Sequence, residues 1–163
     1  MQFMTGKTKK QTVEISDILM GDYEGREVKM NGAIHKIRDM GDVAFIVLRK
    51  REGLVQTVYE KGIEGLSLGN LTEESTVEIS GVVTPEERAP HGFEIRLKHM
   101  DVLSSPCEAM PIAINKWKLN TSLETKLDLR PLTLRNVRER AKFRIQEGIV
   151  RGFREFLHEE GFT

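Results

Sequence analysis

The side chains of this sequence that could do chemistry favour binding over catalysis. Arg49, Lys50 and Arg51 form a basic turn, which could hold phosphates or could equally well be solvated. Gln56 interrupts an apolar segment with an amide that offers a donor and an acceptor. An exposed strand position explains Gln56 as well as a binding role does. Phe45 lies in the middle of another apolar segment, and this pattern alone favours a core position.

Catalytic and metal-binding constellations are missing from the sequence. The four histidines are scattered without metal-ligand spacing, and we expect all of them on the surface: His35, His91, His99 and His158. The only cysteine, Cys107, excludes an internal disulfide and is expected to be semi-buried. No G-x-x-x-x-G-K-[ST] phosphate loop occurs. The sequence therefore predicts no catalytic residue and no metal site.

The composition is that of an ordinary globular protein. Lys+Arg and Asp+Glu number 25 each in 163 residues, so the net charge is zero. This neutrality argues against coating nucleic acid by bulk charge, although it leaves a local basic face open. No apolar run approaches the ~20 residues that a membrane span needs. The basic N-terminus lacks the apolar stretch of a signal peptide, and we expect a cytoplasmic protein that does not bind membranes.

Five short segments carry the signals of β-strands. They alternate apolar and polar residues or are rich in β-branched and aromatic side chains, at 27–37, 43–49, 54–59, 75–83 and 93–103. Gly32 predicts a bulge or bend in the first. With a loop or short helix at 61–71, this order predicts a mainly β, five-stranded OB-fold barrel over residues 21–104. The spacing also suits an SH3-like barrel. Residues 1–20 form an N-terminal arm, with a short helix or extended stretch at 13–20.

The last third of the sequence differs in character. Residues 105–135 contain three prolines and little periodicity, so they are interpreted as a hinge or linker, with Trp117 anchoring it by burial. From Asn136, a suitable N-cap, apolar residues recur at three- and four-residue spacing up to Gly161, a suitable C-cap. This pattern predicts one long amphipathic helix of about six turns. A small barrel has no obvious place to bury its wide apolar stripe, so the helix packs on the barrel, dimerises or contacts another domain.

Three stretches resemble one enzyme family in consistent order over residues 25–163. The run from Arg38-Asp39-Met40-Gly41 through Phe45-Ile46 to Gln56 resembles the anticodon-binding domain of aspartyl-tRNA synthetases. The stretch Asp128-Leu129-Arg130-Pro131 resembles the hinge of that family. Residues 141–145 and 153–162 resemble the helix that opens motif 1 of the class II catalytic domain. The chain thus resembles the N-terminal region of a class II aspartyl/asparaginyl-tRNA synthetase of the archaeal-style aspartyl type, truncated within motif 1.

This resemblance implies nucleic-acid-binding roles for four side chains, and the basic turn adds Arg49 as a fifth candidate. Phe45 stacks on the middle anticodon base, a uracil, and Gln56 hydrogen-bonds to it. Arg38 is placed for the same base or the loop backbone, and Glu94 for the first or third base. Arg49 belongs to the basic turn that could hold phosphates.

One departure from the family concerns a missing aromatic platform. Gly32-Ala33 stands where many members have Gly-Trp. The middle uracil is common to aspartate, asparagine and lysine anticodons, so Phe45 and Gln56 do not choose among these amino acids. The run from Arg38 to Gln56 and the hinge favour the aspartyl type.

The resemblance also implies what the chain does and does not do. Its partner is a tRNA anticodon stem-loop, and the full-length parent is an ATP-dependent aspartate–tRNA ligase that forms a homodimer through motif 1. Residues 136–163 are then the first helix of an incomplete catalytic domain. Motifs 2 and 3 are absent, so the chain alone is expected to be inactive, and ATP and Mg²⁺ are expected only for the parent. The alternatives are a free-standing OB module that binds single-stranded nucleic acid or proteins, and a truncated paralogue that dimerises through the helix.

Overall fold

The computed structural model describes residues 12–63 and 68–163. Contacts between Cα atoms divide the chain into two compact units, Met1–Glu108 and Ala109–Thr163. The predicted arm at 1–11 and part of the predicted loop at 61–71 lie outside the described residues. Among the residues described, no helix is both long enough and apolar enough to cross a membrane.

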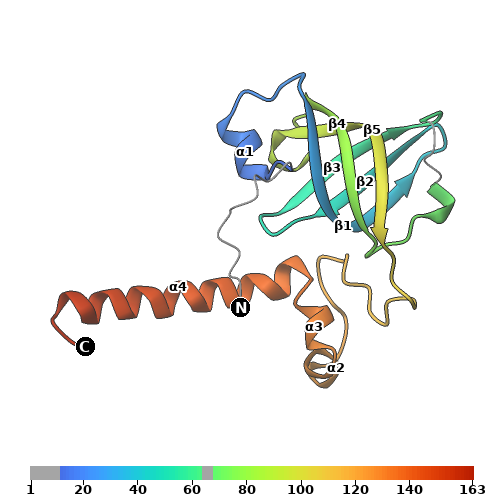
Figure 1. The fold of residues 1–163 in the computed structure, drawn as a ribbon. Helices are drawn as coiled ribbons and strands as arrows, with labels where there is room; N and C mark the ends of the chain where they lie inside the picture. Colours follow the sequence, from blue (N-terminus) through green and yellow to red (C-terminus); the bar gives the residue numbers. More distant parts are fainter. Residues whose placement is uncertain (1–11, 64–67) are drawn as a thin grey trace, which may run out of the picture. The chain divides into compact units, whose positions relative to one another are not determined.

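The first unit is a five-stranded β-barrel (Figure 1). Its strands are β1 (Glu27–Asp39), β2 (Val43–Arg49), β3 (Leu54–Glu60), β4 (Thr76–Pro85) and β5 (Phe93–Ser104). They close in the order β1-β2-β3-β5-β4, and all neighbours are antiparallel except β3 and β5. This closed arrangement is an OB-fold, which confirms the predicted fold class and, to within two residues at each end, the five predicted strands.

β1 is long and contains a bulge, and it pairs with both β4 and β2. Its first half pairs with β4 and its second half with β2. Ile34 pairs with Leu48 and Lys36 with Val47, so His35 is left without a partner on β2. The predicted irregularity therefore falls at His35 instead of Gly32. An unpaired residue shifts the alternation by one position.

A second bulge lies in β5 and explains an irregular sequence pattern. Gly81 pairs with Leu97 and Ser80 with His99, so Lys98 is skipped. The inward parity consequently changes, and Met100 is buried although it does not share the parity of Leu97. The predicted set Phe93, Ile95 and Leu97 faces the core as expected.

α1 (Ile15–Met20) covers part of the barrel core with Ile15 and Ile18. The N-terminal stretch that could be helical or extended is therefore helical. The backbone N–H of Ser16 donates to one carboxylate oxygen of Glu52 at 2.8 Å, and its hydroxyl donates to the other at 2.9 Å. These bonds hold the pKa of Glu52 below its ordinary value and tie α1 to the turn between β2 and β3.

Two short 3-10 helices lie in the longer connections of the barrel. The first, η1 (Leu68–Asn70), precedes β4, and the second, η2 (Pro90–Gly92), precedes β5. The N–H of Glu86 donates to the carbonyl of Gly92 at 3.0 Å, which closes the β4–β5 connection on itself. The connection is thereby held in one conformation beside β5.

The second unit contains three helices: α2 (Leu123–Asp128), α3 (Arg130–Thr133) and α4 (Val137–Glu159). The first two lie within the segment that was predicted to be a linker. They are set by local signals, a Ser122 cap on α2 and Pro131 in the first turn of α3, which leave no periodic pattern. The predicted long helix is confirmed by α4, and the glycine after it, Gly161, has a left-handed φ of 83°.

Two predictions of burial in this part of the chain are wrong. Trp117 is 73% exposed, and its ring lies 5.9 Å from the guanidinium carbon of Arg138. A planar cation over the ring face replaces the core contact expected for the indole. Cys107 is also exposed, because it follows the last strand of the barrel instead of packing under it.

Asn136 organises the start of α4. Its side-chain oxygen accepts from the N–H groups of Arg138 and Glu139, both at 3.1 Å. Its amide nitrogen donates to the carbonyls of Ile114 and Lys116 at 2.8 and 2.7 Å. Asn136 is 2% exposed, so one buried amide both caps the helix and holds the preceding segment.

The apolar face of α4 is uncovered within the second unit as described. No residue of α4 is buried, and Ile145, Ile149 and Phe153 are 65%, 67% and 63% exposed. The helix carries the apolar stripe predicted from its spacing.

We predict that Gly81→Ala destabilises the barrel by about 1–3 kcal/mol, since a Cβ there would collide with the backbone oxygen of Arg96. Urea unfolding followed by circular dichroism measures this loss. Gly148→Ala is the control, because a Cβ at Gly148 meets nothing within 4 Å on α4. An equal stability for Gly81→Ala and the parent would contradict the close approach of β4 and β5.

We also predict that Asn136→Ala costs about 2–4 kcal/mol, because it removes the cap and leaves the carbonyls of Ile114 and Lys116 without a donor. Ser122→Ala, which removes only one capping bond of α2, should cost about 1 kcal/mol. Fluorescence of the single tryptophan during urea unfolding compares the two variants. Equal losses would show that the tether of Asn136 is unimportant.

Candidate nucleic-acid interface

A groove on the outer face of the barrel brings together four of the five predicted site residues. Arg38, Phe45, Gln56 and Glu94 line it, and they come from β1, β2, β3 and β5 respectively. The remaining predicted residue, Arg49, does not line this groove. Residues far apart in the sequence therefore meet on one surface of neighbouring strands.

Strand register explains this meeting. Arg38 pairs with Phe45, Phe45 pairs with Val58, and Val58 pairs with Arg96, so these four form one row across the barrel surface. Side chains directly opposite on adjacent strands lie close enough to contact one another. The next row contains Gln56, which pairs with Glu94 across the parallel β3–β5 junction.

Gln56 and Glu94 are joined by a hydrogen bond of 3.1 Å from the amide nitrogen to the carboxylate. A carboxylate only accepts, so this bond decides which end of the amide faces Glu94. The amide oxygen and the second N–H of Gln56 are thereby directed elsewhere. Glu94 is 8% exposed, so this hydrogen bond satisfies a largely buried carboxylate.

Phe45 is half-buried on the outside of the barrel. Its neighbours Ala44 and Ile46 are fully buried and point into the core. The core position that the apolar run favoured for Phe45 is therefore wrong. Alternation along β2 places the ring in the groove, with one part of its surface accessible.

Arg49, which does not line the groove, belongs to a buried ion pair. Its guanidinium donates to both carboxylate oxygens of Glu74, at 2.5 and 2.7 Å, and the two side chains are 9% and 3% exposed. A bidentate pair of this kind fixes the guanidinium in one orientation. It ties the end of β2 to the start of β4.

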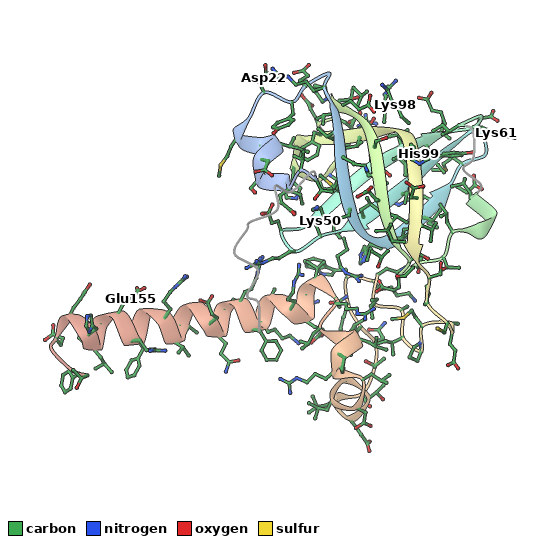
Figure 2. The ribbon with its side chains drawn as sticks, viewed as in Figure 1. Asp22, Lys50, Lys61, Lys98, His99 and Glu155 are labelled. Carbon is green, nitrogen blue, oxygen red and sulfur yellow. The ribbon has the colours of Figure 1, made fainter. Side chains whose placement is uncertain are left out.

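Two of the three cations in the basic turn, Arg49 and Lys50, are bonded within the protein. The ammonium of Lys50, labelled in Figure 2, donates to the carbonyl of Asn31 at 3.0 Å and lies 3.1 Å from the carboxylate of Glu14. Lys50 is 7% exposed. Of the three cations, only Arg51 is exposed to solvent. Two residues of this basic run, Arg49 and Lys50, therefore form ion pairs within the fold.

His35 is the one histidine that departs from the predicted surface position. It is 7% exposed, at the bulge of β1, and its Nδ1 lies 3.4 Å from a terminal nitrogen of Arg49. Burial, followed by the positive charge of Arg49, lowers the pKa of His35 below its ordinary 6.5. The neutral imidazole is therefore the form that fits beside Arg49.

Sequence reasoning missed four charged residues that line the same groove: Glu60, Glu86, Arg88 and Arg96. The alternation of Glu94 and Arg96 with the apolar Phe93, Ile95 and Leu97 could have placed Arg96 beside Glu94. Arg88 lies in the β4–β5 connection, where no periodicity marks it.

The groove contains as many cations as anions. Arg38, Arg88 and Arg96 face Glu60, Glu86 and Glu94. A balanced set of donors and acceptors beside an aromatic ring suits the edges and faces of unpaired bases better than it suits phosphates. In the parts of the chain that are described, no three histidine, cysteine or acidic side chains gather as a metal ion requires.

Comparisons with known proteins define the class of this domain. Residues 28–103 match the family described as the tRNA anticodon OB-fold nucleic acid binding domain. The match begins within β1 and ends within β5, so it covers the barrel. The chain therefore contains an OB-fold of the anticodon-binding family, and this membership supports binding of tRNA.

Curated relatives identify the branch of that family. The chain is 40% identical over 141 residues to an aspartate–tRNA(Asp/Asn) ligase from Deinococcus radiodurans and 37% identical over 145 residues to one from Archaeoglobus fulgidus. Each alignment covers 86% of this chain. The chain spans only 31% and 34% of the length of these two relatives.

Solved structures of aspartyl- and asparaginyl-tRNA synthetases resemble this chain in fold. Aspartyl-tRNA synthetase from Entamoeba histolytica is 26% identical, with a TM-score of 0.77 that covers 96% of this chain and 39% of that one. Asparaginyl-tRNA synthetase from Pyrococcus horikoshii is 29% identical, with a TM-score of 0.73 that covers 85% and 32%. Residues 28–103 therefore belong to the anticodon-binding OB-fold family, and the chain is similar to part of the aspartyl- and asparaginyl-tRNA synthetases.

We predict that His35 makes folding stability depend on pH. Its folded-state pKa is below 6.5, so the unfolded chain takes up a proton first as the pH falls. The contribution of the neutral side chain is present above about pH 6.5 and is lost progressively below it. His35→Gln should therefore lose less stability than the parent between about pH 7.5 and pH 5.5. Urea midpoints by circular dichroism measure the difference, with the exposed His158→Gln as control. Parallel pH profiles for His35→Gln and the parent would contradict this prediction.

Proposed function

We propose that the groove reads the middle uracil of the anticodon in aspartate or asparagine tRNA. The observation that carries this proposal is the hydrogen bond between Gln56 and Glu94 beside the half-buried ring of Phe45. It combines an oriented amide with a flat apolar surface. These are the two elements that recognition of a single unpaired base requires.

Phe45 supplies the flat surface. Stacking of a base on an aromatic side chain is worth about 1–3 kcal/mol and does not depend on the identity of the base. Val58 lies opposite Phe45 in the same row, so the floor of the groove beside the ring is apolar. Phe45 thus contributes affinity for an unstacked base rather than selectivity.

Gln56 supplies the selectivity for uracil. The Watson–Crick edge of uracil presents an N–H donor between two carbonyl acceptors, and an amide matches this edge with one acceptor and one donor. Cytosine presents an acceptor and an amino donor at the corresponding positions. A free amide could rotate to match either base, but the bond to Glu94 opposes that rotation.

Arg38 and Glu94 complete the proposed contacts. Arg38 is exposed at the end of the groove formed by β1 and reaches the middle base or the loop backbone. Glu94 retains acceptor capacity for a neighbouring base. Arg49 has no part in this proposal, because its guanidinium is bonded to Glu74.

The relatives of this chain suggest the activity of the full-length protein. We propose that the chain serves within an aspartate–tRNA(Asp/Asn) ligase, whose ATP- and Mg²⁺-dependent chemistry and homodimer contacts involve residues beyond the barrel. Recognition of the anticodon stem-loop is the contribution of the residues described. We expect the protein to act in the cytoplasm.

The proposal is tested by binding of anticodon stem-loops that differ only at the middle base. Replacement of the middle uracil by cytosine should weaken binding by about 5- to 150-fold, which corresponds to about 1–3 kcal/mol for one base contact. Fluorescence anisotropy with labelled loops measures this ratio. A second pair of loops with C or U as the third base tests whether that position is read.

Two variants separate the two elements of the site. Phe45→Ala should weaken binding to every loop by about 1–3 kcal/mol, whereas Gln56→Met should remove the preference for uracil. Lys98→Gln, outside the groove, is the control (Figure 2). Unchanged binding by Phe45→Ala, or equal binding of all loops by the unsubstituted protein, would contradict the roles proposed for Phe45 and Gln56. The second outcome would favour a general single-stranded nucleic acid binder.

A further inference from the structure

The neutral net charge of the chain conceals an uneven distribution. Residues 1–108 contain 14 Lys and Arg against 18 Asp and Glu, which is a formal charge of −4. Residues 109–163 contain 11 against seven, which is +4. Within the second unit, residues 109–144 hold nine cations and three anions, a charge of +6.

Because of this distribution, the unit that contains the barrel has no net positive charge to attract RNA. Affinity for nucleic acid arises mainly from cations that neutralise phosphates and release counterions. The unit that contains the groove is anionic, and the groove itself has three cations and three anions. Contacts to base edges supply selectivity, whereas the electrostatic share of binding has to come from another surface.

The second unit presents such a surface around its tryptophan. Lys116, Trp117, Lys118 and Arg138 are all exposed, and Trp117 is 73% exposed. The guanidinium of Arg138 lies over the indole ring at 5.9 Å. In the described ranges, none of the three cations has an ion-pair partner. Lys126 and Lys142, by contrast, share the carboxylate of Glu139 at 3.2 and 2.6 Å.

Asn136 holds the two halves of this surface together. It accepts from the N–H of Arg138 and donates to the carbonyl of Lys116. One buried amide therefore bonds to the backbone of the residue before Trp117 and to the backbone of the arginine over its ring. The bonds also occupy N–H groups at the start of α4, so an anion would have to bind to side chains there. The surface is therefore positioned by the fold and does not depend on a free helix end.

We propose that the surface of Lys116, Trp117, Lys118 and Arg138 binds the sugar–phosphate backbone of RNA. This inference rests on the proposed function in one respect, since the RNA would be the tRNA whose anticodon the groove reads. Two lysines flanking an exposed indole, with a guanidinium stacked on it, combine phosphate donors with a face for a ribose or base. An acidic protein surface would use the lysines but would gain little from a planar stack.

The experiment compares binding of whole tRNA by the complete chain at several salt concentrations. The double variant Lys116→Gln/Lys118→Gln should bind tRNA more weakly, by the same factor whether the middle anticodon base is uracil or cytosine. Each phosphate contact contributes about −0.9 to the slope of log K against log salt. The affinity lost between about 50 and 200 mM salt should therefore be about tenfold smaller for the double variant than for the parent.

A matched variant removes the same charge from the barrel. Lys29 and Lys98 are exposed and paired with Glu78 and Glu27, and neither lines the groove. Lys29→Gln/Lys98→Gln should leave the salt slope unchanged. An equal change of slope in both double variants would mean that bulk charge alone matters, and no change in either would mean that this surface does not contact RNA. Both outcomes overturn the proposal.

The single tryptophan reports directly on the proposed contact. Addition of tRNA should alter the emission of Trp117, whereas poly-glutamate at the same charge concentration should not. A change with poly-glutamate but not with tRNA would assign the surface to an acidic protein and overturn the proposal. Failure of the groove assignment remains distinguishable, because it abolishes the preference for the middle uracil without altering the salt slope of the parent.

Discussion

The parallel pairing of β3 with β5 is the constraint on which the recognition surface depends. This pairing closes the barrel and is the step that sets Gln56 opposite Glu94. Without it, the amide and the carboxylate would lie on separate edges, 38 residues apart in sequence. An open sheet would keep Phe45 and Arg38 adjacent but would leave the amide free to rotate. The pairing of β3 with β5 that closes the barrel therefore also orients the side chain of Gln56.

Charge is used differently in the groove and around it. Inside the groove, cations and anions balance, and each group offers directional hydrogen bonds. Outside the groove, Arg49 pairs with Glu74, and Lys50 pairs with Glu14 and donates to a backbone carbonyl. Breaking such buried pairs leaves an uncompensated charge, so these cations stabilise the strand ends that carry the site. The excess positive charge lies in the second unit.

Local patterns in the sequence predicted the strands and the long helix, because alternation and helical spacing can be recognised in a single chain, and the family resemblance supplied four of the groove residues. They did not predict partners that arise from closure. Arg49 looked available because Glu74 is 25 residues away, and His35 looked exposed because a bulge is invisible to a period of two. Trp117 looked like a core residue because size usually predicts burial. Arg88 had no pattern at all, since its position depends on a connection that folds back on itself.

The bulges at His35 and Lys98 each shift the register of one strand, and a further shift at the end of β5 skips Leu103. On either side of each bulge, odd- and even-numbered residues exchange the inside and the outside of the barrel. An insertion or deletion of one residue elsewhere in β1 or β5 would shift this alternation and turn the apolar side chains of one half of the strand outward. Length changes in this domain should therefore accumulate in the connections between strands, where they leave the alignment of Phe45, Gln56 and Glu94 intact. Removal of His35 or Lys98 itself would leave a regular alternation, because each is the extra residue of its strand, but it would remove the bend and the added twist of the bulge.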